Sequence, residues 1–170
     1  VVLDDTYCSQ LHEEVSKYHA HKLNLDKLEC VVSIIAHHAS SDRTFAGLLV
    51  GQVGIQCKRT KKDITAAVCG LKKLAKAGFR HGDARLPNVV MQGEKAVWLD
   101  LRTLDVVEQT GVKTQIEAFR MDLNTFVKSI DGAGKVSDNM LGQQVDVFFE
   151  DDGGDSDHPL IRQMSALGEQ

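Results

Sequence analysis

The sequence predicts an α+β fold in which a mostly helical C-terminal part follows a smaller N-terminal part. Apolar residues recur every three or four positions over 64–75, which predicts a central amphipathic helix. Two short β-rich segments, 89–91 and 96–99, follow it around a four-residue turn and predict a small hairpin. A second pair of β-rich segments within 28–53 predicts another hairpin upstream.

The N-terminal part is expected to consist of one helix and one β-hairpin. Acidic capping residues and apolar residues at helical spacing predict a helix over roughly 5–20. Segments 28–36 and 45–53 are rich in β-branched and apolar residues and are separated by a polar turn, so they are expected to pair. Gly51 and Gly54 would then let the chain leave the second strand through a flexible connection.

The C-terminal part is expected to be mainly helical. Asp63 is the expected N-cap of the central helix, and Gly78 stands where a left-handed C-cap belongs. A further helix is expected over roughly 114–130, and a short one over 159–167.

Length and composition exclude several classes of protein. The 170 residues, 42% of them hydrophobic and 26% charged, fit one globular domain. A net charge of −4 gives no electrostatic footprint for nucleic acid, and no apolar segment approaches membrane-spanning length. The four cysteines form no CxxC pair and are expected to be reduced and mostly buried, with two bridges as the alternative.

The segment 79–102 contains the side chains needed for phosphoryl transfer. This chemistry needs a carboxylate that orients the attacking hydroxyl and oxygen ligands that hold Mg²⁺. Asp83 can supply the first, and Asn88 and Asp100 the second. Arg85, two residues after Asp83, can reach the transferred phosphoryl group. The predicted hairpin between Asn88 and Asp100 would bring both metal ligands into one site.

These residues resemble the protein-kinase-like superfamily. Residues 81–88 carry His-Gly-Asp followed by Asn, which resembles the catalytic loop His-x-Asp-x-x-x-x-Asn. Residues 99–102, Leu-Asp-Leu-Arg, stand where typical kinases have a metal-binding Asp-Phe-Gly. Glycine after the histidine, at Gly82, is more similar to aminoglycoside and choline kinases and to the kinase-like domains of crinkler effectors. Arg102 departs from the usual glycine, so a switchable activation loop is not expected.

The resemblance implies a role for each part of the chain. Residues 1–54 would be a remnant N-lobe with its hinge, and 55–170 a kinase-like C-lobe. His81 would join Asp83 and Arg85 as catalytic residues, with ATP and Mg²⁺ as cofactors. In the C-lobe, Asp122 would brace the catalytic loop through backbone N–H groups.

The resemblance also assigns roles in the remnant N-lobe. Gly51 and Gly54 would contact the adenine of ATP at the hinge. Glu13 or Glu14 would be the helix glutamate that pairs with the phosphate-binding lysine. Only four residues precede the first helix, so no glycine-rich loop and no such lysine are expected in this chain.

Because the sequence begins at Val1, either the first N-lobe strands have been removed or the fold is naturally reduced, and we expect weak or no ATP binding. An exposed edge strand at this point would invite formation of a homodimer.

The leading functional hypothesis is a kinase-like phosphotransferase acting on a protein hydroxyl. The crinkler resemblance implies secretion by a pathogen and action on a protein substrate or partner inside a host cell, often in its nucleus. The alternatives are a truncated pseudokinase that binds a partner protein and a small-molecule kinase. A structural turn at 81–83 without catalytic function is the remaining interpretation.

Two metal sites are weaker alternatives. His12, His19, His37 and His38 could meet in a zinc site, although recognised ligand spacing is lacking. The acidic run 150–157 offers oxygen ligands for Ca²⁺ but misses the usual loop pattern, so a solvated loop is expected.

Overall fold

The computed structural model describes residues 5–39, 46–51, 54–107, 112–130, 142–151 and 158–168. Five α-helices, seven strands and two short 3₁₀ turns are assigned in these ranges. In chain order they are α1 (Asp5–Leu28), β1 (Ile34–Ala39), β2 (Ala46–Val50), β3 (Ile55–Gln56), α2 (Lys61–Lys76), β4 (Phe79–Arg80), η1 (Leu86–Asn88), β5 (Val89–Gln92), β6 (Lys95–Trp98), η2 (Leu101–Thr103), β7 (Asp105–Val106), α3 (Val112–Ile130), α4 (Gly142–Glu150) and α5 (Pro159–Gly168). The expected α+β class is confirmed.

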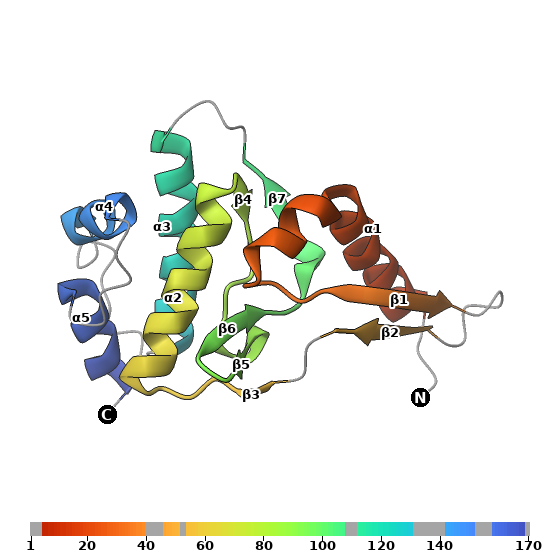
Figure 1. Cartoon of the computed structure of the whole chain (residues 1–170), viewed down its shortest axis with the longest axis horizontal. Coiled ribbons are helices and arrows are strands. Elements are labelled where there is room, and N and C mark those ends of the chain that lie inside the picture. Colours follow the sequence, from red (N-terminus) through yellow and green to blue (C-terminus); the bar gives the residue numbers. More distant parts are fainter. Residues whose placement is uncertain are drawn as a thin grey trace.

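The elements are arranged around α2 and the small sheet that follows it. Helices α2 and α3 lie side by side, with α4 and α5 beyond them, while α1 and the β1–β2 hairpin lie on the opposite side (Figure 1). Strands β3, β5 and β6 form an antiparallel sheet in that order, and β4 pairs with β7. None of the described helices is both long and apolar enough to cross a membrane.

The expected N-terminal helix is longer than predicted. It continues to Leu28, and its second half carries a side-chain network in which Lys22 contacts both Tyr18 (3.0 Å) and Asp26 (2.8 Å). This i, i+4 pairing stabilises the helix beyond residue 20. The upstream hairpin is confirmed, but its first strand begins at Ile34, because residues 30–32 pair with the backbone of Trp98 instead.

The central helix begins three residues earlier than expected. Its N-cap is Thr60, not Asp63, and the Thr60 hydroxyl accepts a hydrogen bond from the Asp63 backbone N–H at 3.2 Å. The Asp63 carboxylate in turn accepts from the backbone N–H of Lys58 at 2.9 Å. At the other end Gly78 has φ +84°, so the predicted left-handed ending is confirmed.

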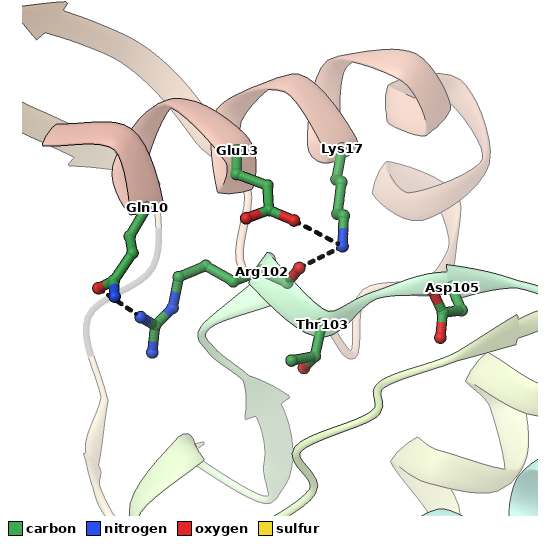
Figure 2. A pocket seen from close by; sticks show the side chains of 6 residues that line it. All are labelled: Gln10, Glu13, Lys17, Arg102, Thr103 and Asp105. Carbon is green, nitrogen blue, oxygen red and sulfur yellow. Dashed lines mark hydrogen bonds and ion pairs between the residues drawn. The ribbon is translucent and has the colours of Figure 1, made fainter. Parts of the chain in front are cut away.

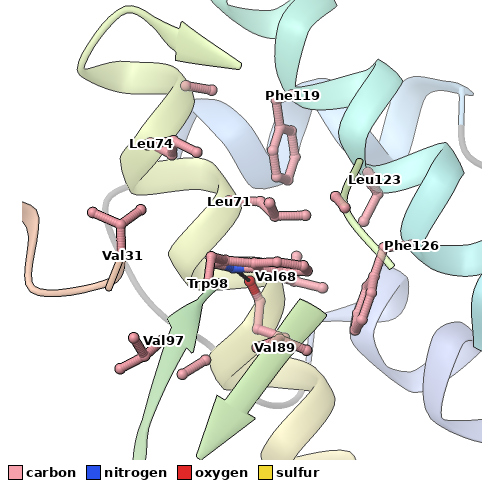
Figure 3. Close-up of a cluster of buried hydrophobic side chains, with 14 of the residues drawn as sticks. Val31, Val68, Leu71, Leu74, Val89, Val97, Trp98, Phe119, Leu123 and Phe126 are labelled. Atoms are coloured by element: carbon pink, nitrogen blue, oxygen red, sulfur yellow. Dashed lines mark hydrogen bonds between the residues drawn. The ribbon is translucent and has the colours of Figure 1, made fainter. Parts of the chain in front are cut away.

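One apolar core connects these elements. Trp98 at the end of β6 is fully buried, and its indole N–H donates to the Ala67 carbonyl of α2 at 3.2 Å. Its ring meets Phe126 of α3 edge-on, with centroids 5.5 Å apart (Figure 3). The backbone of Trp98 also donates to the Cys30 carbonyl at 2.9 Å, which ties the end of the first helix to the second hairpin.

The C-terminal region contains one helix that was not expected, α4. Val145, Phe148 and Phe149 form its buried stripe. The ring of Phe148 stacks on Phe119 of α3, and the ring of Phe149 packs against it at a tilt. Lys72 of α2 closes the far end of this helix by donating to the Phe148 carbonyl at 2.5 Å.

Two other sequence predictions concern the tail and the cysteines. Most of the acidic run 150–157 lies outside the described residues, so that prediction is not tested. All four cysteines are described, and no disulfide joins them. Cys8, Cys30 and Cys57 are buried and Cys69 is half-buried.

Candidate functional site

The loop after β4 is fixed by a buried carboxylate from α3. Asp122, only 3% exposed, accepts hydrogen bonds from the backbone N–H groups of His81 (2.7 Å) and Gly82 (2.9 Å). Burial raises the pKa of Asp122, while these two N–H donors oppose that rise. The predicted brace of this loop by Asp122 is confirmed.

Gly82 is required by the conformation and the neighbours of the loop. Its φ is +82°, and a Cβ atom there would lie 2.4 Å from the Thr103 carbonyl oxygen. The Thr103 hydroxyl donates to the His81 carbonyl at 2.8 Å. The loop and the turn η2 are therefore in direct contact.

His81 has its whole side chain inside the protein. Its Nε2 lies 2.8 Å from the Leu99 carbonyl and must donate, so its Nδ1 is the acceptor for the Asp83 backbone N–H at 3.3 Å. Burial lowers the pKa of this ring, which agrees with a neutral imidazole. His81 also packs on Trp98, with ring centroids 5.2 Å apart. This geometry makes His81 a connection between the loop and the end of β6.

Asp83, Arg85 and Asn88 form one hydrogen-bonded group. The side-chain amide nitrogen of Asn88 donates to both the backbone carbonyl and the carboxylate Oδ2 of Asp83, each at 2.9 Å. Arg85 donates to the same Oδ2 at 2.6 Å, and this contact raises the pKa of the guanidinium. Both amide hydrogens of Asn88 are thus used, so its Oδ1 is the atom that can bind a cation.

The hairpin brings the backbone of Leu99, the residue before Asp100, next to Asn88. The Leu99 backbone N–H donates to the Asn88 carbonyl at 2.8 Å, which places Asp100 at the next position of the strand end. Asp100 adopts a left-handed backbone conformation, with φ 58° and ψ 73°. Non-glycine residues rarely adopt this conformation outside sites where the surrounding structure imposes it.

Arg102 binds the Asp100 carboxylate with both ends of a fork. Its Nε donates to Oδ1 and its Nη2 to Oδ2, each at 2.6 Å. This contact lowers the pKa of Asp100 and raises that of Arg102. The third guanidinium nitrogen, Nη1, donates to Gln10 of α1 at 2.7 Å. Sequence reasoning identified Arg102 only as a departure from glycine and did not predict these contacts.

Helix α1 contacts the turn η2 through two further polar side chains, Glu14 and Lys17. Glu14 accepts from the Leu101 backbone N–H at 3.1 Å, and burial raises the pKa of its carboxyl. Lys17 donates to the Arg102 carbonyl and pairs with Glu13 at 3.2 Å (Figure 2). Glu13 thus pairs with a lysine of its own helix, and Glu14 binds a backbone N–H group of η2.

A pocket of about 500 Å³ opens between α1 and the η2–β7 segment (Figure 2). Its walls are polar and include both positive and negative side chains. The lining residues are Gln10, Glu13, Lys17, Arg102, Thr103 and Asp105.

The two hinge glycines lie in the connection between the β1–β2 hairpin and β3. Gly51 donates its backbone N–H to the Ser33 carbonyl at 2.9 Å. Gly54 approaches β5 so closely that a Cβ atom would lie 2.8 Å from a Val90 methyl group. Contact of either glycine with adenine stays a prediction.

The histidine zinc site finds no support. Within the described ranges, which include all four histidines concerned, no group of three or more His, Cys, Asp or Glu side chains is arranged to hold a metal ion. His19 and His37 do approach each other, with ring centroids 6.0 Å apart. A Mg²⁺ site is different in kind, since it usually takes one or two carboxylates and completes its shell with water and phosphate oxygens.

The chain is similar in structure to a divergent kinase. That protein, from Toxoplasma, lacks the glycine-rich loop and regulates membrane ultrastructure of the parasitophorous vacuole. The match has a TM-score of 0.40 and 15% sequence identity, and it covers 82% of this chain and 55% of the other. This chain thus spans about half the length of its structural neighbour. Similarity at this level assigns neither a family nor an activity.

Comparison of the sequence alone identifies no related protein. No family model matches the sequence, and no curated protein matches it.

Proposed function

We propose that residues 81–102 form a phosphotransferase site of the protein-kinase-like type. The single observation that carries this proposal is the hydrogen-bonded unit around Asn88. Its amide donates to Asp83, and its backbone carbonyl accepts from Leu99, next to Asp100. These contacts support a site in which Asp83 would orient the hydroxyl and Asn88 and Asp100 would provide oxygen ligands.

The roles of the individual residues follow from their contacts. Asp83 would accept the proton of the attacking hydroxyl, and Arg85 beside it would contact the phosphoryl group being transferred. Asn88 Oδ1 and the Asp100 carboxylate would hold Mg²⁺, which neutralises charge on the phosphates when ATP is bound. His81 and Asp122 are positioning residues, because their polar atoms are used to hold the loop.

The nature of the acceptor rests on the resemblance alone. The similarity of the loop to crinkler effector domains favours a protein hydroxyl as acceptor and a host protein as partner.

Calorimetric titration with Mg²⁺–ATP tests the proposal. We expect saturable binding, weak in absolute terms, which is lost in Asp100→Ala and retained in Glu117→Gln. Glu117 is a suitable control because its carboxyl is exposed on α3 and its removal also changes the charge by one. Transfer of labelled γ-phosphate to the chain itself or to mixed protein acceptors should then be lost in Asp83→Ala. Absence of Mg²⁺–ATP binding in the wild type would overturn the proposal.

The second candidate is a non-catalytic module that binds a partner protein. It is favoured by a specific observation, namely that Arg102 occupies both oxygens of Asp100. A protein of this kind would keep its thermal stability unchanged on addition of Mg²⁺–ATP, whereas a nucleotide-binding site would raise it.

We also propose that the β1–β2 hairpin is a self-association edge. Among the described strands it forms a separate two-stranded sheet, and it exposes Ile35 (62%) and Leu49 (58%). Sedimentation should detect a dimer in the wild type and a monomer in Ile35→Lys. A wild-type chain that is monomeric at all concentrations would contradict this proposal.

A further inference from the structure

The Asp100 carboxylate already has a cation bound to it, the side chain of Arg102. Two parallel N–H···O contacts of 2.6 Å use both carboxylate oxygens in the plane of the guanidinium. Asp100 keeps only 22% of its side chain exposed and Arg102 36%, so the pair is partly shielded from water. Such bidentate contacts are among the strongest hydrogen bonds that proteins form.

The fork is also held from behind by the first helix. Gln10 accepts from the remaining Nη1 of Arg102 at 2.7 Å, across a separation of 92 residues. The adjacent backbone is held by Glu14, which binds the Leu101 N–H. The guanidinium is therefore held by Asp100 through Nε and Nη2 and by Gln10 of helix α1 through Nη1.

We propose that Arg102 is a resident cation that competes with a divalent metal ion for Asp100, and that Gln10 strengthens this competition from α1. This inference rests on the proposed function, because it takes Asp100 as a metal ligand. It makes Arg102 the residue that sets the metal affinity of the site.

The competition follows from charge and space. A divalent ion bound directly to Asp100 would stand within a few ångströms of the guanidinium, and the two positive charges would repel each other strongly. A metal ion bound between the two carboxylate oxygens would also need the lone pairs that the fork now uses. Coordination at that position therefore requires Arg102 to turn away and to lose both contacts.

The neighbouring pocket offers the displaced guanidinium a place to go. Arg102 lines this cavity of about 500 Å³ together with the carboxylates of Glu13 and Asp105 (Figure 2). The exposed Asp105 carboxylate could receive the side chain once a metal ion holds Asp100, and Glu13 could do so only beside Lys17, with which it already pairs at 3.2 Å. After this move the Arg102 guanidinium would still have a carboxylate partner and contact with water. The free-energy cost of separating it from Asp100 would therefore be limited.

Binding of Mn²⁺ in the absence of nucleotide tests this inference directly. Free Mn²⁺ is measured by electron paramagnetic resonance in titrations of the whole chain. We expect Arg102→Gln to bind Mn²⁺ at least tenfold more tightly than the wild type, and Gln10→Ala to bind it a few-fold more tightly. Circular dichroism checks that each variant is folded, and Gln10→Ala keeps the question answerable if Arg102→Gln does not fold.

The double variant Arg102→Gln/Asp100→Asn separates this inference from the proposed function. We expect this double variant to bind Mn²⁺ no more tightly than the wild type, which would show that the affinity gained in Arg102→Gln depends on Asp100. If Asp100→Asn weakens Mn²⁺ binding while Arg102→Gln and Gln10→Ala leave it unchanged or weaker, the competition is refuted and the proposed metal ligand stands. If Asp100→Asn has no effect in any background, the metal ligand itself is wrong and both proposals fail.

Discussion

Replacing Asp122 should release the loop that carries the candidate site. In Asp122→Ala the backbone N–H groups of His81, which is buried, and of Gly82, which is half-buried, lose their common acceptor. An unsatisfied buried donor costs roughly 1–3 kcal/mol, so the two together cost about 4 kcal/mol. Removing a buried charge returns about 1 kcal/mol of desolvation free energy. We therefore expect a loss of about 3 kcal/mol in the free energy of unfolding.

Asp122→Asn provides the graded comparison. It keeps one acceptor oxygen of nearly the same shape, so only one N–H group is left unsatisfied and the expected loss is about 1–2 kcal/mol. The control Glu117→Gln removes an exposed carboxyl from the same helix and should change stability by less than about 0.5 kcal/mol.

Urea unfolding followed by tryptophan fluorescence measures these differences. Trp98 is the single tryptophan, and its ring lies 5.2 Å from the His81 ring, so it reports on the loop as well as the core. Hydrogen exchange at the His81 and Gly82 amides should also accelerate in Asp122→Ala. If this variant unfolds within about 0.5 kcal/mol of the wild type, the carboxylate is not the support that we infer.

Three further predictions concern the loop, a buried lysine and pH. Gly82→Ala should lower the free energy of unfolding by more than about 2 kcal/mol in urea titration, because of its positive φ and the clash with the Thr103 carbonyl. Lys72→Met should lower it by about 1–3 kcal/mol in the same assay, since the Phe148 carbonyl loses a buried donor. For His81, burial lowers the pKa in the folded state below the ordinary 6.5. As the pH falls, the histidine therefore becomes protonated in the unfolded chain before it does so in the folded protein. Stability should therefore fall as pH falls below about 6.5, by up to about 1.4 kcal/mol per pH unit, and unfolding titrations of His81→Gln should lack this component.

Each of these predictions has a matched control within the chain. Gly93→Ala also has a positive φ (63°) but meets no atom within 4 Å, so it should cost only about 1 kcal/mol. Equal losses at both glycines would mean that the Thr103 clash does not matter. Lys73→Met alters an exposed neighbour of Lys72, and His12→Gln an exposed histidine, and both should behave like the wild type.

The local elements could be predicted because their signals are local. The stripe of α2, its glycine ending and the turn of the second hairpin each depend on residues a few positions apart. Helix α4 was not predicted, although Val145, Phe148 and Phe149 have helical spacing. A segment of nine residues is too short for its periodicity to identify a helix. Its formation depends on packing against α3.

The contacts that shape the candidate site were mostly beyond sequence reasoning. Asp122 was predicted as a brace only through a resemblance, since 41 residues separate it from His81. The contact between Gln10 and Arg102 spans 92 residues, and neither residue type indicates the other. Periodicity places a residue on a face of its own element, and the fold alone decides which distant side chain meets it.

Gly82 and Arg102 have a common structural cause. The loop has glycine at position 82 because the Thr103 carbonyl of η2 would lie 2.4 Å from any Cβ atom there. The same short turn directs Arg102, one residue earlier, back onto Asp100. A side chain at 82 would push η2 away and would loosen the fork at the same time. The fit of Gly82 and the position of Arg102 therefore both depend on the backbone conformation of η2. Gly82→Ala should weaken the ion pair between Asp100 and Arg102, although it replaces neither residue.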